Sequence, residues 1–150
     1  MVTRQLSELS IVIETDGGAI DVEQLTDFFY HFRAAYSAAI GIGALDANSD
    51  PENLAELVRQ KAYGKDWQAL AKLAHKDLRE NMLGIIDIRR QNPLTIVFEG
   101  VLVAVTVAVI LSGGKLKIGP LKANLPPLGV GIRSLRDAFG RKKLRDKKKP

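Results

Sequence analysis

Residues 100–119 read GVLVAVTVAVILSGGKLKIG, and this stretch decides the fold. The stretch continues an apolar run that covers residues 94–111, eighteen residues interrupted only by Glu99. The uncharged part, residues 100–114, has fifteen residues, fewer than the roughly twenty that a helix needs to cross a bilayer. A helix here would be apolar on nearly every side, so it must be buried in protein or in lipid.

On a helix, four small residues fall on one line at four-residue spacing: Gly100, Ala104, Ala108 and Ser112. Such a ridge allows apolar helices to approach one another closely. The helical interpretation therefore predicts that these four residues mediate self-association, and that the protein is a homo-oligomer.

The same residues also suit a strand, because valines alternate with other apolar residues from Val101 to Ile110. Ser112-Gly113-Gly114-Lys115 would then be the turn of a β-hairpin that returns through residues 115–118. Alternation produces the four-residue ridge as well, so the ridge does not separate the two interpretations. A buried helix and a β-hairpin both remain open at this point.

The preceding residues predict a small acidic α+β domain over 1–98 with a strand, three helices and a second strand. Leu9, Ile11 and Ile13 alternate with polar or smaller residues, as in a half-buried strand. Helices are predicted after the capping residues Asp21, Asp50 and Asp66. The second strand follows Gly84, and Pro93 interrupts it, which indicates an edge position or a bulge.

Residues 99–114 are predicted to be a separate apolar segment, associated with a membrane or with an oligomer interface. Residues 115–150 follow as a basic C-terminal region. This region starts with a proline-rich connector, PLKANLPPLG, for which an extended conformation is expected. An amphipathic helix comes next, with Ile132, Leu135 and Phe139 on one side and Arg133 and Arg136 on the other.

The net charge of +5 conceals a division along the chain. Residues 1–114 hold ten Lys/Arg and fifteen Asp/Glu, a net charge of −5, whereas residues 115–150 hold twelve and two, a net charge of +10. An anionic partner is therefore expected for the C-terminal end alone. The residues predicted to bind an anionic surface are Arg141, Lys142, Lys143, Arg145, Lys147, Lys148 and Lys149.

Residues that would mark an enzyme are sparse. The chain has no cysteine and only two histidines, His31 and His75, which fall in different predicted helices. Phosphate-binding, zinc-protease and nucleophile-elbow motifs are absent. Residues 46–51 begin like a calcium loop, but Pro51 stands where that loop requires glycine. We predict a non-enzymatic protein with no cofactor, metal or small-molecule substrate, although carboxylate catalysis leaves little trace in one sequence.

These features favour a small self-associating protein that acts at the cytoplasmic face of the plasma membrane, for example a membrane-perturbing effector. The N-terminus lacks the basic start and apolar run of a signal peptide, and exporting the basic end would oppose the positive-inside rule. The alternative is a soluble oligomer that binds nucleic acid through its basic tail, without sequence specificity because the tail has no aromatic residue for stacking on bases.

Overall fold

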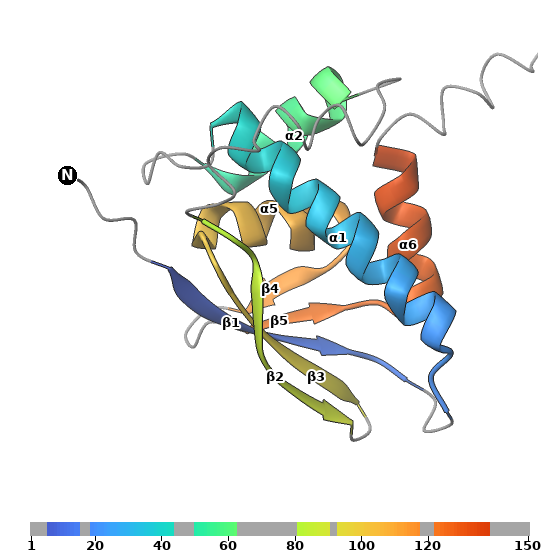
Figure 1. Cartoon of the computed structure of the whole chain (residues 1–150). Helices are drawn as coiled ribbons and strands as arrows, with labels where there is room; N and C mark the ends of the chain where they lie inside the picture. The colour runs from blue at the N-terminus through green and yellow to red at the C-terminus, as the bar shows by residue number, and fades with distance from the viewer. Residues whose placement is uncertain are drawn as a thin grey trace, which may run out of the picture.

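In the part of the chain that the structure describes, five strands form one mixed sheet, and four helices cover it (Figure 1). The computed structural model describes residues 6–15, 19–43, 50–62, 81–90, 93–117 and 122–138. In chain order the elements are β1 (Ser7–Ile13), α1 (Val22–Ile42), α2 (Pro51–Ala62), β2 (Gly84–Arg90), β3 (Leu94–Gly100), α5 (Leu102–Leu111), β4 (Lys115–Lys117), β5 (Lys122–Leu125) and α6 (Leu128–Arg136). The predicted α+β class is confirmed.

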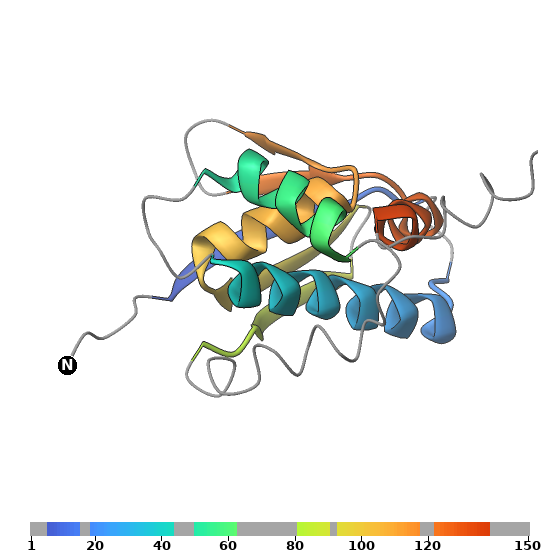
Figure 2. The ribbon, with the colours of Figure 1, turned by 90° about the horizontal axis from the view of Figure 1, so that it is seen from above.

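The strands are ordered β2-β3-β1-β5-β4, so β1 is the central strand. It pairs antiparallel with β3 and parallel with β5, while β2 and β4 form the two edges. The two views together show all four helices on the same face of the sheet (Figures 1 and 2). The opposite face is not covered by any of these four helices.

The alternation in β1 determines which face of the sheet is buried. Leu9, Ile11 and Ile13 are fully buried, and they lie opposite Phe98, Ile96 and Leu94 of β3. These six apolar side chains alternate with the polar or half-exposed ones along both strands. The helices therefore pack on a continuous apolar surface, as the period of two predicts.

The stretch that left two interpretations open is a helix, and the hairpin alternative is wrong. Six of the ten residues of α5 are β-branched, which disfavours a helix intrinsically. Burial overrides this preference, because α5 packs against the sheet and against the helices α1 and α2 (Figure 1), and most of its side chains are buried. As a strand, this segment would need both of its apolar faces buried by other elements. As a helix packed against the sheet and two other helices, it buries apolar side chains on most of its sides.

The glycines expected to form a hairpin turn instead end α5. Gly113 has φ 81°, its N–H donates to the Ile110 carbonyl, and the Gly114 N–H donates to the Val109 carbonyl. This pair of bonds is the Schellman arrangement, which satisfies carbonyls that the helix end leaves open. The Ser134 hydroxyl of α6 donates to the Leu111 carbonyl at 2.8 Å, so a second helix helps to close the end.

Three predicted strand and connector boundaries need correction. The single strand expected after Gly84 is two antiparallel strands, β2 and β3, and Pro93 precedes the second one, outside the ladder. The connector expected after Pro120 contains β5, because Ala123 and Leu125 of this short strand are buried beside β1. Residues 115–117, expected to be part of a hairpin only in the rejected alternative, form β4 against β5.

Helices α1 and α2 begin where their caps predict them, whereas α6 begins at Leu128, within the predicted proline-rich connector, and has no side-chain cap. The Asp21 carboxylate accepts from the Gln24 N–H at 3.1 Å, and the Asp50 carboxylate accepts from the Glu52 N–H at 3.3 Å. Gly43 ends α1, with its N–H bonded to the Ala39 carbonyl. The helix expected after Asp66 lies outside the described residues.

One hydrophobic core contains residues from both sides of the predicted segment boundaries. The boundary after residue 98 falls within β3, and the boundary after residue 114 falls between α5 and β4. Side chains of β1, α1, α5, β5 and α6 share the same buried cluster. The apolar side of α6 also belongs to it, because Ile132 and Leu135 are buried while Arg133 is exposed.

Candidate functional site

The four residues predicted to mediate self-association lie inside the chain. Gly100 is buried at the end of β3, Ala104 and Ala108 are fully buried on α5, and Ser112 is buried at its end. The Ser112 hydroxyl donates to the Ala108 carbonyl at 2.7 Å. The small-residue ridge therefore belongs to the packing of α5 within its own chain, and in this fold it is not accessible to a second copy.

A buried phenol fixes the start of α5. The Tyr36 hydroxyl of α1 donates to the Asn81 carbonyl at 2.5 Å and accepts from the Val101 N–H at 2.9 Å. A Cβ atom on Gly100 would lie only 3.0 Å from the Tyr36 hydroxyl oxygen. Glycine at this position is thus what allows the ring to reach the junction between β3 and α5.

Replacing Tyr36 with Phe tests this junction. The buried Val101 N–H loses its acceptor, which is expected to lower the free energy of unfolding by about 1–3 kcal/mol. Burial also raises the pKa of the Tyr36 phenol above its usual value. The neutral phenol therefore stabilises the fold fully below a pH of about 10, and this stabilisation is lost as the pH rises through the raised pKa.

Urea unfolding at neutral and at alkaline pH measures both effects. At neutral pH the Tyr36→Phe variant should have a lower free energy of unfolding than the natural chain. Between neutral and alkaline pH, its free energy of unfolding should fall by less than that of the natural chain. Tyr30→Phe is the matched control, because Tyr30 is half-exposed on the same helix and should leave both values nearly unchanged. If the natural chain and Tyr36→Phe lost the same free energy of unfolding at alkaline pH, the neutral Tyr36 phenol would not be the group that stabilises the fold.

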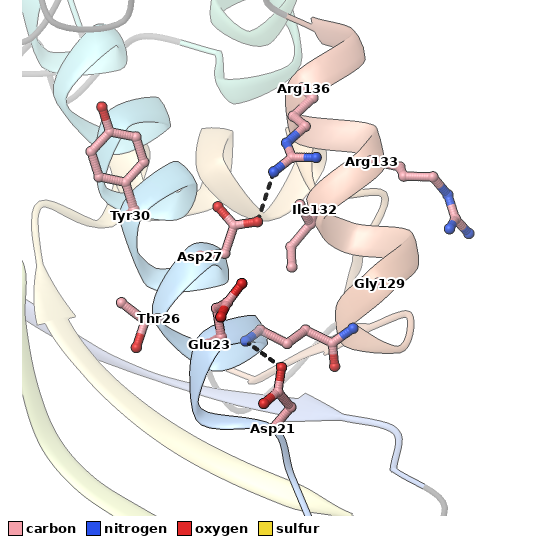
Figure 3. Close-up of a pocket in the computed structure, with 10 residues that line it drawn as sticks. Asp21, Glu23, Thr26, Asp27, Tyr30, Gly129, Ile132, Arg133 and Arg136 are labelled. Carbon is pink, nitrogen blue, oxygen red and sulfur yellow. Dashed lines mark hydrogen bonds and ion pairs between the residues drawn. The ribbon is translucent and has the colours of Figure 1, made fainter.

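A groove of about 990 Å³ lies between the first turns of α1 and the facing side of α6. Its lining combines carboxylates from α1 and its cap with guanidinium groups from α6 (Figure 3). Arg136 points toward Asp27, and its Nη2 atom lies 2.8 Å from an Asp27 carboxylate oxygen. Arg133 points away from this pair (Figure 3).

The polar groups in this groove serve the fold. The Asp21 carboxylate caps α1. The Asp27 carboxylate joins α6 to α1 through Arg136, and it also lies 3.1 Å from Nδ1 of His31, one turn further along α1. Among the described residues, no group of three or more histidine or acidic side chains is arranged to hold a metal ion. Of its charged groups, Asp21 caps a helix and Asp27 and Arg136 pair with each other, and the lining supplies no arrangement of nucleophile and base that indicates a reaction.

The seven basic residues predicted to bind an anionic surface lie outside the described residues. Their point of attachment is described, because α6 precedes them and its last turn carries Arg133 and Arg136. Lys122 of β5 lies opposite Ser10 of β1, and Lys115 of β4 lies opposite Asn124, so both lysines belong to the register of the uncovered sheet face. Further positive charge is thus present among the described residues.

Exposed apolar side chains on β2 were not expected from the sequence. Ile85, Ile86 and Ile88 are 47%, 51% and 45% exposed. The ladder shifts register between Ile85 and Asp87, so Ile86 is the extra residue of a β-bulge. The sequence signal was the doubled isoleucine in GIIDI, which breaks the alternation of a regular half-buried strand.

In the part of the chain that the structure describes, no helix combines the length and the apolar character needed to cross a membrane. No family model matches the chain, and comparisons with curated proteins and with solved structures likewise find no match.

Proposed function

We propose that this is a non-enzymatic, self-associating protein whose basic C-terminal tail binds the anionic cytoplasmic surface of a membrane. The observation that supports the proposal is the division of charge, −5 over residues 1–114 against +10 over residues 115–150. Lysine or arginine near an anionic bilayer contributes about 1 kcal/mol per residue to binding. Seven such residues among the last ten make the tail a strong electrostatic attachment site.

The proposed binding is adsorption onto the surface and requires no insertion of α5. The side chains of α5 and the apolar side of α6 are already used in the hydrophobic core. Exposing α5 to lipid would remove its packing against α1, α2 and the sheet. The main argument for a membrane-perturbing role was an apolar segment free to enter lipid, and in this fold that segment is buried. Reversible attachment to the surface is therefore the form of membrane action that agrees best with the fold.

The composition of the tail favours a diffuse anionic surface over a nucleic-acid site. Five of its seven basic residues are lysines, which act as hydrated point charges, whereas arginine is preferred where phosphates are bound in bidentate geometry. The tail also contains Leu144, an apolar residue that suits the boundary of a bilayer. Nucleic acid remains the competing partner that the experiment must exclude.

Sedimentation with vesicles tests the proposal on the full-length chain. Binding is expected to vesicles that contain phosphatidylserine and not to neutral phosphatidylcholine vesicles, and it should fall as salt is added. Replacing the seven basic tail residues with glutamine should weaken binding at least a hundredfold, since most of the electrostatic attraction is removed. A tail with the same residues in shuffled order is the matched control and should bind like the natural chain.

Two outcomes would contradict the proposal. Equal binding of the glutamine variant and the natural chain would show that the tail is not the attachment site. The second outcome is competition by duplex DNA at a phosphate concentration far below that of the vesicle lipid. Such competition would make the nucleic-acid alternative the better function, because the same charges would then prefer the polyanion.

A further inference from the structure

The two edges of the sheet differ in how they are protected against pairing with another strand. Edge strand β4 has three residues, KLK, and lysines on a short edge disfavour the approach of a further strand. Edge strand β2 has seven residues, and its three isoleucines are each about half exposed. Among the described strands, β3 is the only one that pairs with β2, so the outer edge of β2 has no partner among them.

The sequence of β2 is complementary to itself in one antiparallel register. The strand reads GIIDIRR, with Ile88 between Asp87 and Arg89. If Ile88 lies opposite the same residue of a second copy, each Asp87 lies opposite an Arg89 of the other copy. Opposite charges placed directly across a strand pair stabilise it. If each strand were shifted by one position, the two Asp87 residues would lie opposite each other, and their like charges would destabilise the pair.

The faces of the strand agree with this register. Ile85 and Ile88 pair in the ladder with Phe98 and Ile96, whose side chains are buried under the helices. Asp87 and Arg89 pair with half-exposed residues of β3, on the uncovered face. In one chain the two charges contact each other along the strand at 2.9 Å, and the side chains of Arg89 and Asp87 are 71% and 42% exposed, so a second strand can reach both.

We propose that β2 pairs antiparallel with β2 of a second copy about a two-fold axis at Ile88, forming a homodimer with one continuous sheet. Backbone hydrogen bonds supply the attachment, the isoleucines lose exposed apolar surface, and the charge pattern sets the register. The two copies carry their helices on the same face of the joined sheet. This inference does not rest on membrane binding, but it gives the proposed self-association a surface other than the buried ridge on α5.

The absence of cysteine allows a direct test of the register. Residues directly opposite in an antiparallel pair have Cα atoms about 4.5–5.5 Å apart, which is within the range that a disulfide bridges. Full-length Ile88→Cys should therefore form a covalent dimer under mild oxidation. Ile85→Cys is the matched control: two copies of position 85 would lie roughly 20 Å apart, so its thiols should not join.

Sedimentation velocity over a range of concentrations gives an independent measurement. The natural chain should show a reversible monomer–dimer equilibrium. Asp87→Arg places like charges opposite one another at two symmetric positions and should raise the dissociation constant roughly tenfold or more. Adding Arg89→Asp to that variant restores opposite charges across the pair and should recover dimerisation.

Thermal melts of all variants at low concentration separate an effect on the dimer from one on the fold. Strictly monomeric natural protein, or cross-linking at position 85 as efficient as at position 88, would overturn the proposal. Failure of the double charge exchange to recover the dimer, with unchanged melting, would overturn the register. None of these results depends on the tail, so they are distinguishable from a failure of vesicle binding.

Discussion

Replacing both Ala104 and Ala108 with leucine is expected to abolish stable folding. Both side chains are fully buried on α5, which packs against the sheet and two helices. The α1 segment that packs with α5 is itself rich in small buried residues, including Ala35, Ala38 and Ala39, so the helices meet where side chains are short. Overpacking costs about 1–3 kcal/mol at each site, a large part of the 5–15 kcal/mol by which a typical domain is stable.

Circular dichroism during heating measures this loss, and Val103→Leu is the matched control. Val103 lies on the same helix but is only partly buried, so its added methylene should shift the melting temperature little. The sequence allowed a different result, in which the double variant melts normally and loses only its assembly. That result would place the ridge between copies of the chain and would contradict the burial of α5.

Replacing Gly114 with alanine is expected to produce the second large loss. An added Cβ would lie 2.8 Å from the Asn124 carbonyl oxygen and 3.0 Å from side-chain carbons of Leu125 and Val109. The first of these atoms belongs to the backbone of β5, which is held between β1 and β4 and cannot rotate aside. The expected cost is about 3 kcal/mol, the upper part of the overpacking range.

Gly84→Ala is the control for the change from glycine to alanine. A Cβ at Gly84 would have one neighbour within 4 Å, the Glu99 carbonyl oxygen at 4.0 Å, so there is room for it. Alanine there should be neutral or stabilising by less than about 1 kcal/mol, because it restricts the unfolded chain. Similar urea midpoints for the two variants would show that the end of α5 is not closely packed against β5.

The sequence predicted those elements whose patterns are local. Alternation located β1, and the capping residues Asp21 and Asp50 located the starts of α1 and α2. The α5 segment remained ambiguous because β-branched residues and strict alternation favour a strand, while the absence of any polar face suits a buried helix. Only the packing of α5 against the sheet and two helices resolves the conflict, and that packing depends on contacts distant in the sequence.

The strands missed by the sequence have related causes. In β5 only Ala123 and Leu125 face the core, and the neighbouring prolines suggested a connector. Its pairing with β1 joins residues more than a hundred positions apart, which no local pattern reveals. The residues of the predicted self-association ridge lie buried within the chain, and local sequence could not reveal this, since small residues at four-residue spacing serve packing within a chain as well as between chains.

Hydrogen exchange of the α5 backbone amides in dilute full-length protein tests the central claim most directly, namely that residues 102–111 form the buried core of a single chain. If α5 is part of this core, its amides exchange slowly and only through global unfolding, with the same protection at low and high protein concentration and with or without anionic vesicles. Rapid exchange in dilute protein, followed by protection when vesicles are added or the concentration is raised, would contradict it.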